Sequence, residues 1–88
     1  TLKPLLGQSP DPKIENGITQ SLLKNKTIIS IHDLMLHNYG PNRFFGSVHV
    51  VVPSDENLLD LHDELFHAEM EIERQFNIYI NIHPDPLT

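Results

Sequence analysis

Residues 43–52, with the sequence RFFGSVHVVV, carry the pattern that decides the fold. Successive side chains of a β-strand point to opposite faces. In this stretch Phe44, Val48, Val50 and Val52 share one face with Gly46, and Phe45, Ser47, His49 and Val51 share the other. The alternation predicts a strand with one apolar face, and it places His49 on the face opposite to the valine row.

The residues before this strand predict a partner for it. Residues 27–38 form a β-branched and apolar run, and residues 38–42, NYGPN, are dense in turn-forming residues. We therefore expect a β-hairpin made of residues 27–38 and 43–52.

The residues after this strand predict a long helix. Pro53 ends the strand, and Ser54 or Asp55 is suited to cap the helix that follows. Apolar residues then recur with the 3.6-residue period that buries one stripe, namely Leu58, Leu61, Leu65, Ala68, Ile72 and Phe76. The pattern predicts a helix over about residues 55–75. In this helix His62 lies at the boundary of the buried stripe, whereas His67 lies nearly opposite the stripe.

The two ends of the chain differ in character. Residues 1–12 contain three prolines and a glycine, so we interpret them as a connector, and the folded domain is placed at residues 13–88. Asp11 is suited to cap a short amphipathic helix whose first turn contains Pro12.

The C-terminal residues predict a last strand that carries two candidate metal ligands. Ile78, Ile80 and Ile82 share one face, and Tyr79, Asn81, His83 and Asp85 share the other. His83 and Asp85 each precede a proline, which favours extended backbone. The two side chains are therefore held on one face, and they would lose little conformational freedom on binding a metal.

The predicted elements define an α+β fold. Their order is helix, strand, strand, helix, strand, which predicts a small two-layer sandwich with both helices on one face of a three-stranded sheet. The other face of the sheet would carry His49, His83 and Asp85.

Composition limits the function classes. Eighty-eight residues make one domain with a modest core, and the absence of cysteine excludes disulfide scaffolds and thiolate metal sites. The formal charge is −6 and the six lysines and arginines are scattered, which argues against nucleic acid as a partner. No apolar run approaches the roughly 20 residues of a membrane-spanning helix.

The histidines suggest a metal site. His32, His49, His62 and His83 fall in or beside the ordered segments, and Asp85 is close to His83 in sequence. Neutral imidazole with carboxylate is a ligand set for borderline divalent metals such as zinc. Simpler interpretations stay open, because Asp33 could merely fix His32 by a hydrogen bond and His62 could merely border the core. We interpret His37 and His67 as ordinary surface residues.

Five short motifs in this order resemble the cytoplasmic C-terminal domain of cation diffusion facilitator transporters, over about residues 13–86. They are IHDL at 31–34, YGP at 39–41, VHV at 48–50, the helical His62, and HPDP at 83–86. The LLG sequence at 5–7 and the proline-rich stretch after it resemble the linker that leaves the last transmembrane helix in that family.

The resemblance implies a metallochaperone-like (ferredoxin-like) fold, a homodimer, and a two-ion site. It implies these metal ligands: His32, His49, His62, His83 and Asp85. Five side chains cannot close two tetrahedral shells of four, so a bridging Asp85, water or a second chain must complete them. The metal is expected to be divalent, with zinc first and cobalt, nickel, iron, manganese and cadmium open.

The leading hypothesis is a domain that binds metal on the cytoplasmic side of the membrane, tightens a homodimer and biases its own transmembrane domain. It is not an enzyme in this hypothesis. Two divalent ions bound per chain would change the formal charge from −6 to −2, which favours dimerisation on metal. The alternatives are a dimerisation scaffold without functional metal and a small-molecule-binding regulatory module.

Overall fold

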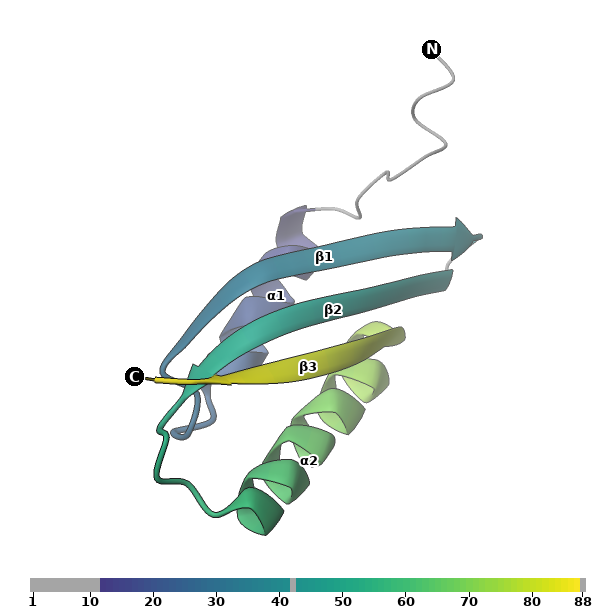
Figure 1. The fold of residues 1–88 in the computed structure, drawn as a ribbon. Helices are drawn as coiled ribbons and strands as arrows, with labels where there is room; N and C mark the ends of the chain where they lie inside the picture. The colour runs from purple at the N-terminus through teal and green to yellow at the C-terminus, as the bar shows by residue number, and fades with distance from the viewer. Residues whose placement is uncertain (1–11, 42, 88) are drawn as a thin grey trace.

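The computed structural model describes residues 12–41 and 43–87, which form five elements in the predicted order (Figure 1). They are α1 (Pro12–Leu23), β1 (Ser30–Gly40), β2 (Arg43–Val52), α2 (Leu58–Phe76) and β3 (Ile78–Pro86). The predicted α+β fold is confirmed. Among the described residues, no helix is both long enough and apolar enough to span a bilayer.

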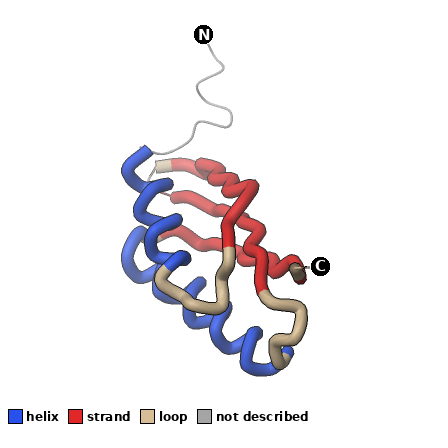
Figure 2. The backbone as a smooth tube through the Cα atoms, turned by 90° about the vertical axis from the view of Figure 1, so that its left-hand side faces the viewer, coloured by secondary structure: helices blue, strands red, loops and turns tan. Residues whose placement is uncertain are grey.

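The three strands form one sheet in the order β1-β2-β3. β1 pairs with β2 antiparallel, as a hairpin requires, and β3 pairs with β2 in parallel. A parallel pair needs a crossover connection, and α2 supplies it. Figure 2 shows the result from the side, with the helices in one layer and the strands in the other.

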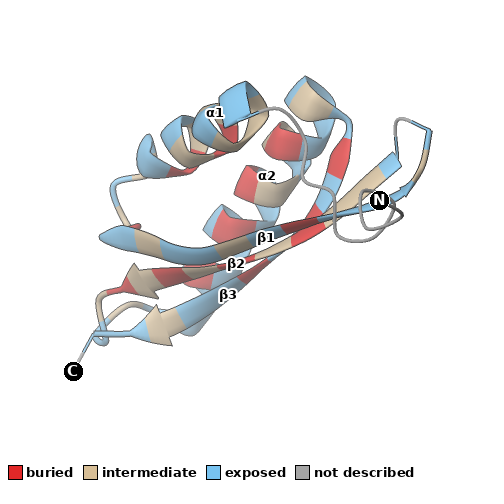
Figure 3. Ribbon diagram, turned by 90° about the horizontal axis from the view of Figure 1, so that it is seen from above, coloured by how far each residue is buried: buried red, intermediate tan, exposed pale blue. Residues whose placement is uncertain are grey.

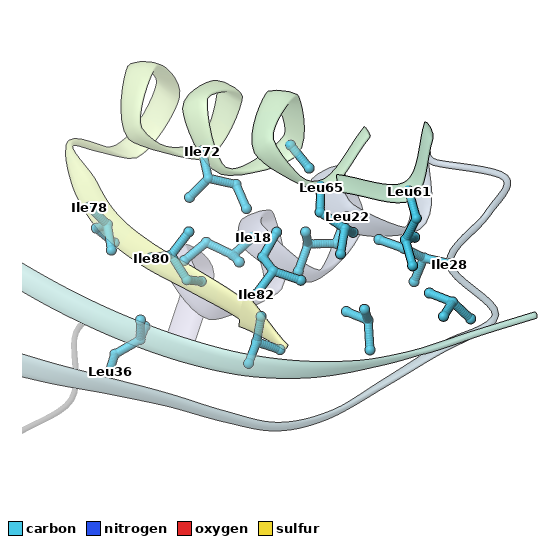
Figure 4. Packing of buried hydrophobic residues seen from close by; sticks show 14 residues of the cluster. Ile18, Leu22, Ile28, Leu36, Leu61, Leu65, Ile72, Ile78, Ile80 and Ile82 are labelled. Carbon is cyan, nitrogen blue, oxygen red and sulfur yellow. The ribbon is translucent and has the colours of Figure 1, made fainter. Parts of the chain in front are cut away.

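The hydrophobic core lies between these layers, on the face of the sheet that the helices cover (Figure 3). Val48 and Val50 of β2 are fully buried, as the alternation predicted. Ile78, Ile80 and Ile82 of β3 extend the same face, and Ile18, Leu22, Leu61, Leu65 and Ile72 reach it from the helices (Figure 4).

The other side of the sheet, here the open face, carries a second set of residues. From β1 it takes His32, Met35 and His37, from β2 it takes Phe45, Ser47, His49 and Val51, and from β3 it takes Tyr79, Asn81, His83 and Asp85. The alternation of the sequence thus assigned both faces of β2 and β3 correctly.

Gly46 allows the core to close beneath the hairpin. A Cβ atom at this position would lie 2.5 Å from Cδ2 of Leu36 and 3.1 Å from the carbonyl oxygen of Met35. Leu36 pairs with Gly46 across the strands and is buried. The absent side chain of the glycine therefore makes room for the leucine.

The predicted boundaries of β1 shift towards the hairpin turn. β1 begins at Ser30 rather than Thr27, because the chain is still turning there: the Ile28 amide donates to the carbonyl of Asn25. The strand continues to Gly40, which pairs with Arg43.

The predicted cap of the long helix was wrong. α2 begins at Leu58, and its cap is Asn57, whose side-chain oxygen accepts hydrogen bonds from the amides of Leu59 and Asp60. Ser54 and Asp55 lie in a turn that the Glu56 amide closes on the carbonyl of Pro53. The helix starts only after this turn.

The start of α1 agrees with the sequence. Pro12 is its first residue, and Ile18 and Leu22 are the buried members of its apolar stripe. The predicted cap Asp11 and the predicted linker up to that residue lie outside the described residues.

Candidate metal centre

Three histidines form one row across the open face, here called the histidine row. His32 of β1 pairs with His49 of β2, and His49 pairs with His83 of β3. Each strand therefore contributes one imidazole at the same level of the sheet. His49 and His83 share the face predicted from the alternation.

The imidazole rings of the histidine row stack on one another. The ring centroids of His32 and His49 are 5.4 Å apart with an interplanar angle of 25°. Those of His49 and His83 are 5.2 Å apart with an angle of 26°. The spacing follows from the sheet, whose neighbouring strands lie roughly 4.8 Å apart.

Asp85 joins two members of this row through one oxygen. Its Oδ2 lies 3.1 Å from Nδ1 of His49 and 3.2 Å from Nε2 of His32. The contact with His49 is a hydrogen bond, and because a carboxylate only accepts, Nδ1 of His49 donates it when the bond forms. Asp85 follows His83 by two residues on the same face, and both precede prolines, as the sequence indicated.

The spacing of these donor atoms suits a small divalent ion. Ligand atoms about 2.1 Å from a tetrahedral zinc ion lie about 3.4 Å from one another. The two separations from Asp85 Oδ2 are close to that value. Within the described part of the chain, however, no three histidine or acidic side chains are already arranged as a metal shell. His49 is instead hydrogen-bonded to Asp85, and Nε2 of His32 contacts the same oxygen.

His62 does not join the histidine row of its own chain. It projects from α2 into a pocket of about 410 Å³ that is also lined by Ile82 and Pro84 of β3. Ile82 belongs to the core face and Pro84 pairs with the buried Val50, so this pocket lies on the helix side of the sheet. The sheet separates His62 from the open face.

The two histidines left out of the predicted site lie elsewhere. His37 shares the open face, but it pairs with Phe45 rather than with a member of the histidine row. His67 is exposed on α2, and its ring lies 6.2 Å from that of Phe66.

One feature of the site was missed by the sequence reasoning. β1 contains a bulge between His32 and Met35, and Asp33 within it has a positive φ of 57°. The signal was present in the spacing of apolar residues, because Ile31 and Leu34 both pack against the core although they are three residues apart. Strict alternation of two would put them on opposite faces.

The hairpin end of the open face carries an aromatic trio, Tyr39, Phe45 and Tyr79. The ring of Phe45 lies 6.1 Å from that of Tyr39 and 5.9 Å from that of Tyr79. Phe44 packs against the core instead, so the prediction of one phenylalanine ring on each face is confirmed. Tyr39 and Tyr79 are 74% and 59% exposed.

A family comparison matches nearly the whole chain. The family model described as the cytoplasmic domain of cation efflux proteins covers residues 10–87. No curated protein sequence matches the chain.

Solved structures with this fold include domains of CzcD, CzrB and MamM. The metal-bound C-terminal domain of the CzcD transporter from Thermotoga maritima has a TM-score of 0.79 at 17% identity, with 85% of this chain and 88% of that one covered. CzrB in its zinc form has a TM-score of 0.77 at 24% identity, with 91% of each chain covered. A cadmium form of the MamM C-terminal domain has a TM-score of 0.74 at 9% identity, with 86% and 96% covered.

Proposed function

Because the chain belongs to the family of cytoplasmic domains of cation efflux proteins, we propose that it is the metal-responsive regulatory domain of a divalent-cation exporter. The family is one of transporter domains and not a class of enzymes. The observation that carries the proposal is the convergence of His32 and His49 on one oxygen of Asp85, on the sheet face opposite to the one that α1 and α2 cover.

The proposed ligands on the open face are the histidine row and Asp85. Their neutral imidazoles and carboxylate match the donor chemistry of zinc, and the same donors accept cobalt, nickel, iron, manganese and cadmium. We propose zinc because CzrB, a protein of the same fold, is known in a zinc form. Binding would require Nδ1 of His49 to give up its hydrogen bond to Asp85 Oδ2, and the imidazoles of the histidine row to turn towards the ion.

The fifth proposed ligand, His62, would act from a second copy of the chain. Within one chain the sheet stands between His62 and the histidine row. Four side chains on the open face are too few for two complete tetrahedral shells, even if Asp85 bridges the ions. A ligand from His62 of the partner subunit would help to complete them and would make metal binding depend on dimerisation.

The open face also supports the proposed homodimer. The aromatic trio leaves Tyr39 and Tyr79 largely exposed, and aromatic residues are enriched at protein interfaces. Two chains of formal charge −6 repel one another, and two bound divalent ions per chain would reduce each charge to −2. Metal binding would therefore favour pairing of the two open faces.

In the proposed transporter, residues 1–12 link this domain to a membrane domain, and the domain lies on the cytoplasmic side. Metal that tightens the pair of domains would then bias the membrane domains to which the two linkers lead. The domain acts as a sensor and a brace, and it does not itself carry the ion across the membrane.

The experiment is a calorimetric zinc titration of the chelator-stripped chain at pH 7, with oligomeric mass measured before and after by analytical ultracentrifugation. His83→Ala and Asp85→Ala are compared with His67→Ala, which removes an exposed helix histidine outside the site. We expect about two ions per chain, a tighter dimer with zinc, loss of binding in the first two variants, and no loss in the third.

Saturable binding that both site variants retain would refute the proposed site. A dimer of equal strength with zinc and with chelator would favour the second candidate, a dimerisation scaffold without functional metal. The exposed aromatic trio is the observation that supports this candidate, because it offers an interface that needs no ion.

A further inference from the structure

Asp33 occupies an unusual position in β1. Among the described residues, Asp33 and Asn77 are the two non-glycine residues with positive φ. Asn77 is the C-cap of α2, where this conformation is common. Asp33 instead lies inside a strand, where the left-handed region costs free energy, although aspartate tolerates it better than most residues.

The bulge at Asp33 determines which way His32 faces. On either side of it, His32 pairs with His49 and Met35 pairs with Ser47, so β1 has one residue more than β2 in this interval. Without the extra residue, His32 would share a face with Leu34 and Leu36, both of which pack in or against the core. With it, His32 faces the histidine row while the two leucines stay inside.

The Asp33 side chain also contacts His32 directly. Its Oδ2 lies 3.0 Å from Nδ1 of His32. Since the carboxylate can only accept, the Nδ1 atom must carry the hydrogen of this bond. The other ring nitrogen, Nε2, lies 3.2 Å from Asp85 Oδ2, a carboxylate oxygen that also favours a hydrogen on the nitrogen facing it. A neutral His32 can satisfy only one of the two acids, and its contact with Asp33 is the one with hydrogen-bond geometry. Once Asp85 turns to an ion, Nε2 can present its lone pair on that side.

This contact contributes little to the stability of the fold. The Asp33 side chain is 70% exposed and that of His32 is 46% exposed. Hydrogen-bonded ion pairs as exposed as this are typically worth less than about 1 kcal/mol. Its main physical effect is thus on the orientation and the tautomer of one ring.

We propose that Asp33 is the positioning residue of His32: its bulge turns the ring to the open face, and its carboxylate accepts the Nδ1 hydrogen so that Nε2, when Asp85 no longer faces it, presents its lone pair to the histidine row. The metal-binding consequence rests on the proposed function, while the placement of the hydrogen does not. A carboxylate that orients a metal-binding imidazole through its second nitrogen is a common device, and its removal typically lowers metal affinity by about 10–100-fold.

The test compares Asp33→Gly with Asp55→Gly in the full 88-residue chain. Glycine keeps the positive φ of the bulge and removes only the carboxylate. Asp55 is an exposed acid in the turn before α2, so its replacement controls for the lost charge. The His32 tautomer is read by two-bond proton–nitrogen correlation NMR at pH 8 in metal-free chains that also carry Asp85→Ala, so that Asp85 does not compete for the ring hydrogen. Zinc affinity is read in chains with Asp85 intact, by competition with a chromophoric chelator.

In the Asp85→Ala background, we expect the chain with Asp33 intact and the chain with Asp55→Gly to hold the hydrogen on Nδ1 of His32. Asp33→Gly should move it to Nε2 in a large fraction of molecules and weaken zinc binding by about 10–100-fold, with a circular dichroism spectrum like that of wild type. An unchanged tautomer in Asp33→Gly would overturn the inference. If the tautomer changes but the wild-type chain binds no zinc, the proposed function fails and the role of Asp33 in setting the ring stands.

Discussion

Oδ2 of Asp85 and Nδ1 of His49 lie 3.1 Å apart although 36 residues separate them in the sequence. The contact exists because β2 and β3 pair in parallel, which places Val51 beside Asp85 and His49 beside His83. Asp85 therefore reaches His49 from the neighbouring residue pair on the same face of the sheet.

Replacing His62 tests whether the helix histidine acts across the proposed dimer. His62 faces a pocket on the helix side, away from the histidine row of its own chain. We expect His62→Ala to retain zinc binding to the open face at protein concentrations where the chain is monomeric. The tightening of the dimer by zinc should be weakened, as measured by ultracentrifugation over a dilution series. Equal tightening in wild type and variant would exclude a ligand role for His62.

Acidification should weaken metal binding. Protons compete with the ion for the imidazole nitrogens and the carboxylate, so binding releases protons and is favoured as the pH rises. We expect zinc affinity to fall steadily between pH 7.5 and pH 5.5 in competition titrations. The calorimetric heat at pH 7 should also depend on the ionisation enthalpy of the buffer. An affinity that does not change with pH would contradict histidine ligation.

Gly46→Ala should destabilise the domain. The new methyl group would meet Leu36 at 2.5 Å in a closed part of the core, and overpacking of this kind typically costs about 1–3 kcal/mol. The free energy of unfolding is measured by urea denaturation. Gly40→Ala is the matched control, because nothing lies within 4 Å of a Cβ atom built there. Similar losses in both variants would indicate a backbone effect instead of a clash.

Asn57→Ala should destabilise α2 at its first turn. The variant removes the oxygen that accepts from the amides of Leu59 and Asp60, which costs typically about 1 kcal/mol. Ser54→Ala, at one of the caps first expected from the sequence, should change the free energy of unfolding by less than about 0.5 kcal/mol. If urea denaturation showed that Ser54→Ala lowers the free energy of unfolding more than Asn57→Ala does, Ser54 would be the cap of α2.

The outer edge of β3, which faces away from β2, is protected from pairing with other strands because several of its backbone N–H groups are absent or already bonded. The Leu87 amide donates to Val52, so alternate residues of this segment bond to β2 and the amides between them point away. On that outer side Pro84 and Pro86 have no N–H, and the Ile82 amide donates to Oε2 of Glu69 on α2 over 2.8 Å. Free edges of this type invite pairing with other strands.

Glu69→Ala should therefore lower the free energy of unfolding by about 1–2 kcal/mol and promote aggregation on heating. Glu69→Gln keeps an acceptor oxygen and should behave more like wild type. Light scattering during a thermal ramp measures the aggregation. If both variants resist aggregation equally, the side chain is not what protects the edge.

The faces of the strands were predictable because they follow from simple alternation. Val48, Val50 and the isoleucines of β3 specify the core side, and His49, His83 and Asp85 follow on the other. The family resemblance drawn from five short motifs is confirmed by the match over residues 10–87. The ligand assignments themselves stay predictions.

The bulge at Asp33 and the cap at Asn57 could not be predicted in the same way. The cap depends on competition between local options that the sequence leaves nearly equal, since Ser54, Asp55 and Asn57 are all good capping residues. The turn closed by Glu56 and Pro53 decides among them. The bulge is signalled only by the three-residue spacing of Ile31 and Leu34, which breaks the alternation. The sequence also did not show that the sheet separates His62 from the histidine row. Helical periodicity predicts which face of a helix is buried, but it does not predict which layer of the fold that face packs against.

The parallel pairing of β2 with β3 has a consequence for how the chain acquires its site. β3 follows α2 in the sequence, and α2 forms the crossover that carries the chain from β2 to the parallel strand beside it. The hairpin of β1 and β2 can form early from local contacts, but it holds just His32 and His49. A growing polypeptide lacks His83 and Asp85 until that part of the chain has emerged from the ribosome, so the complete cluster cannot capture metal while only the hairpin has been made.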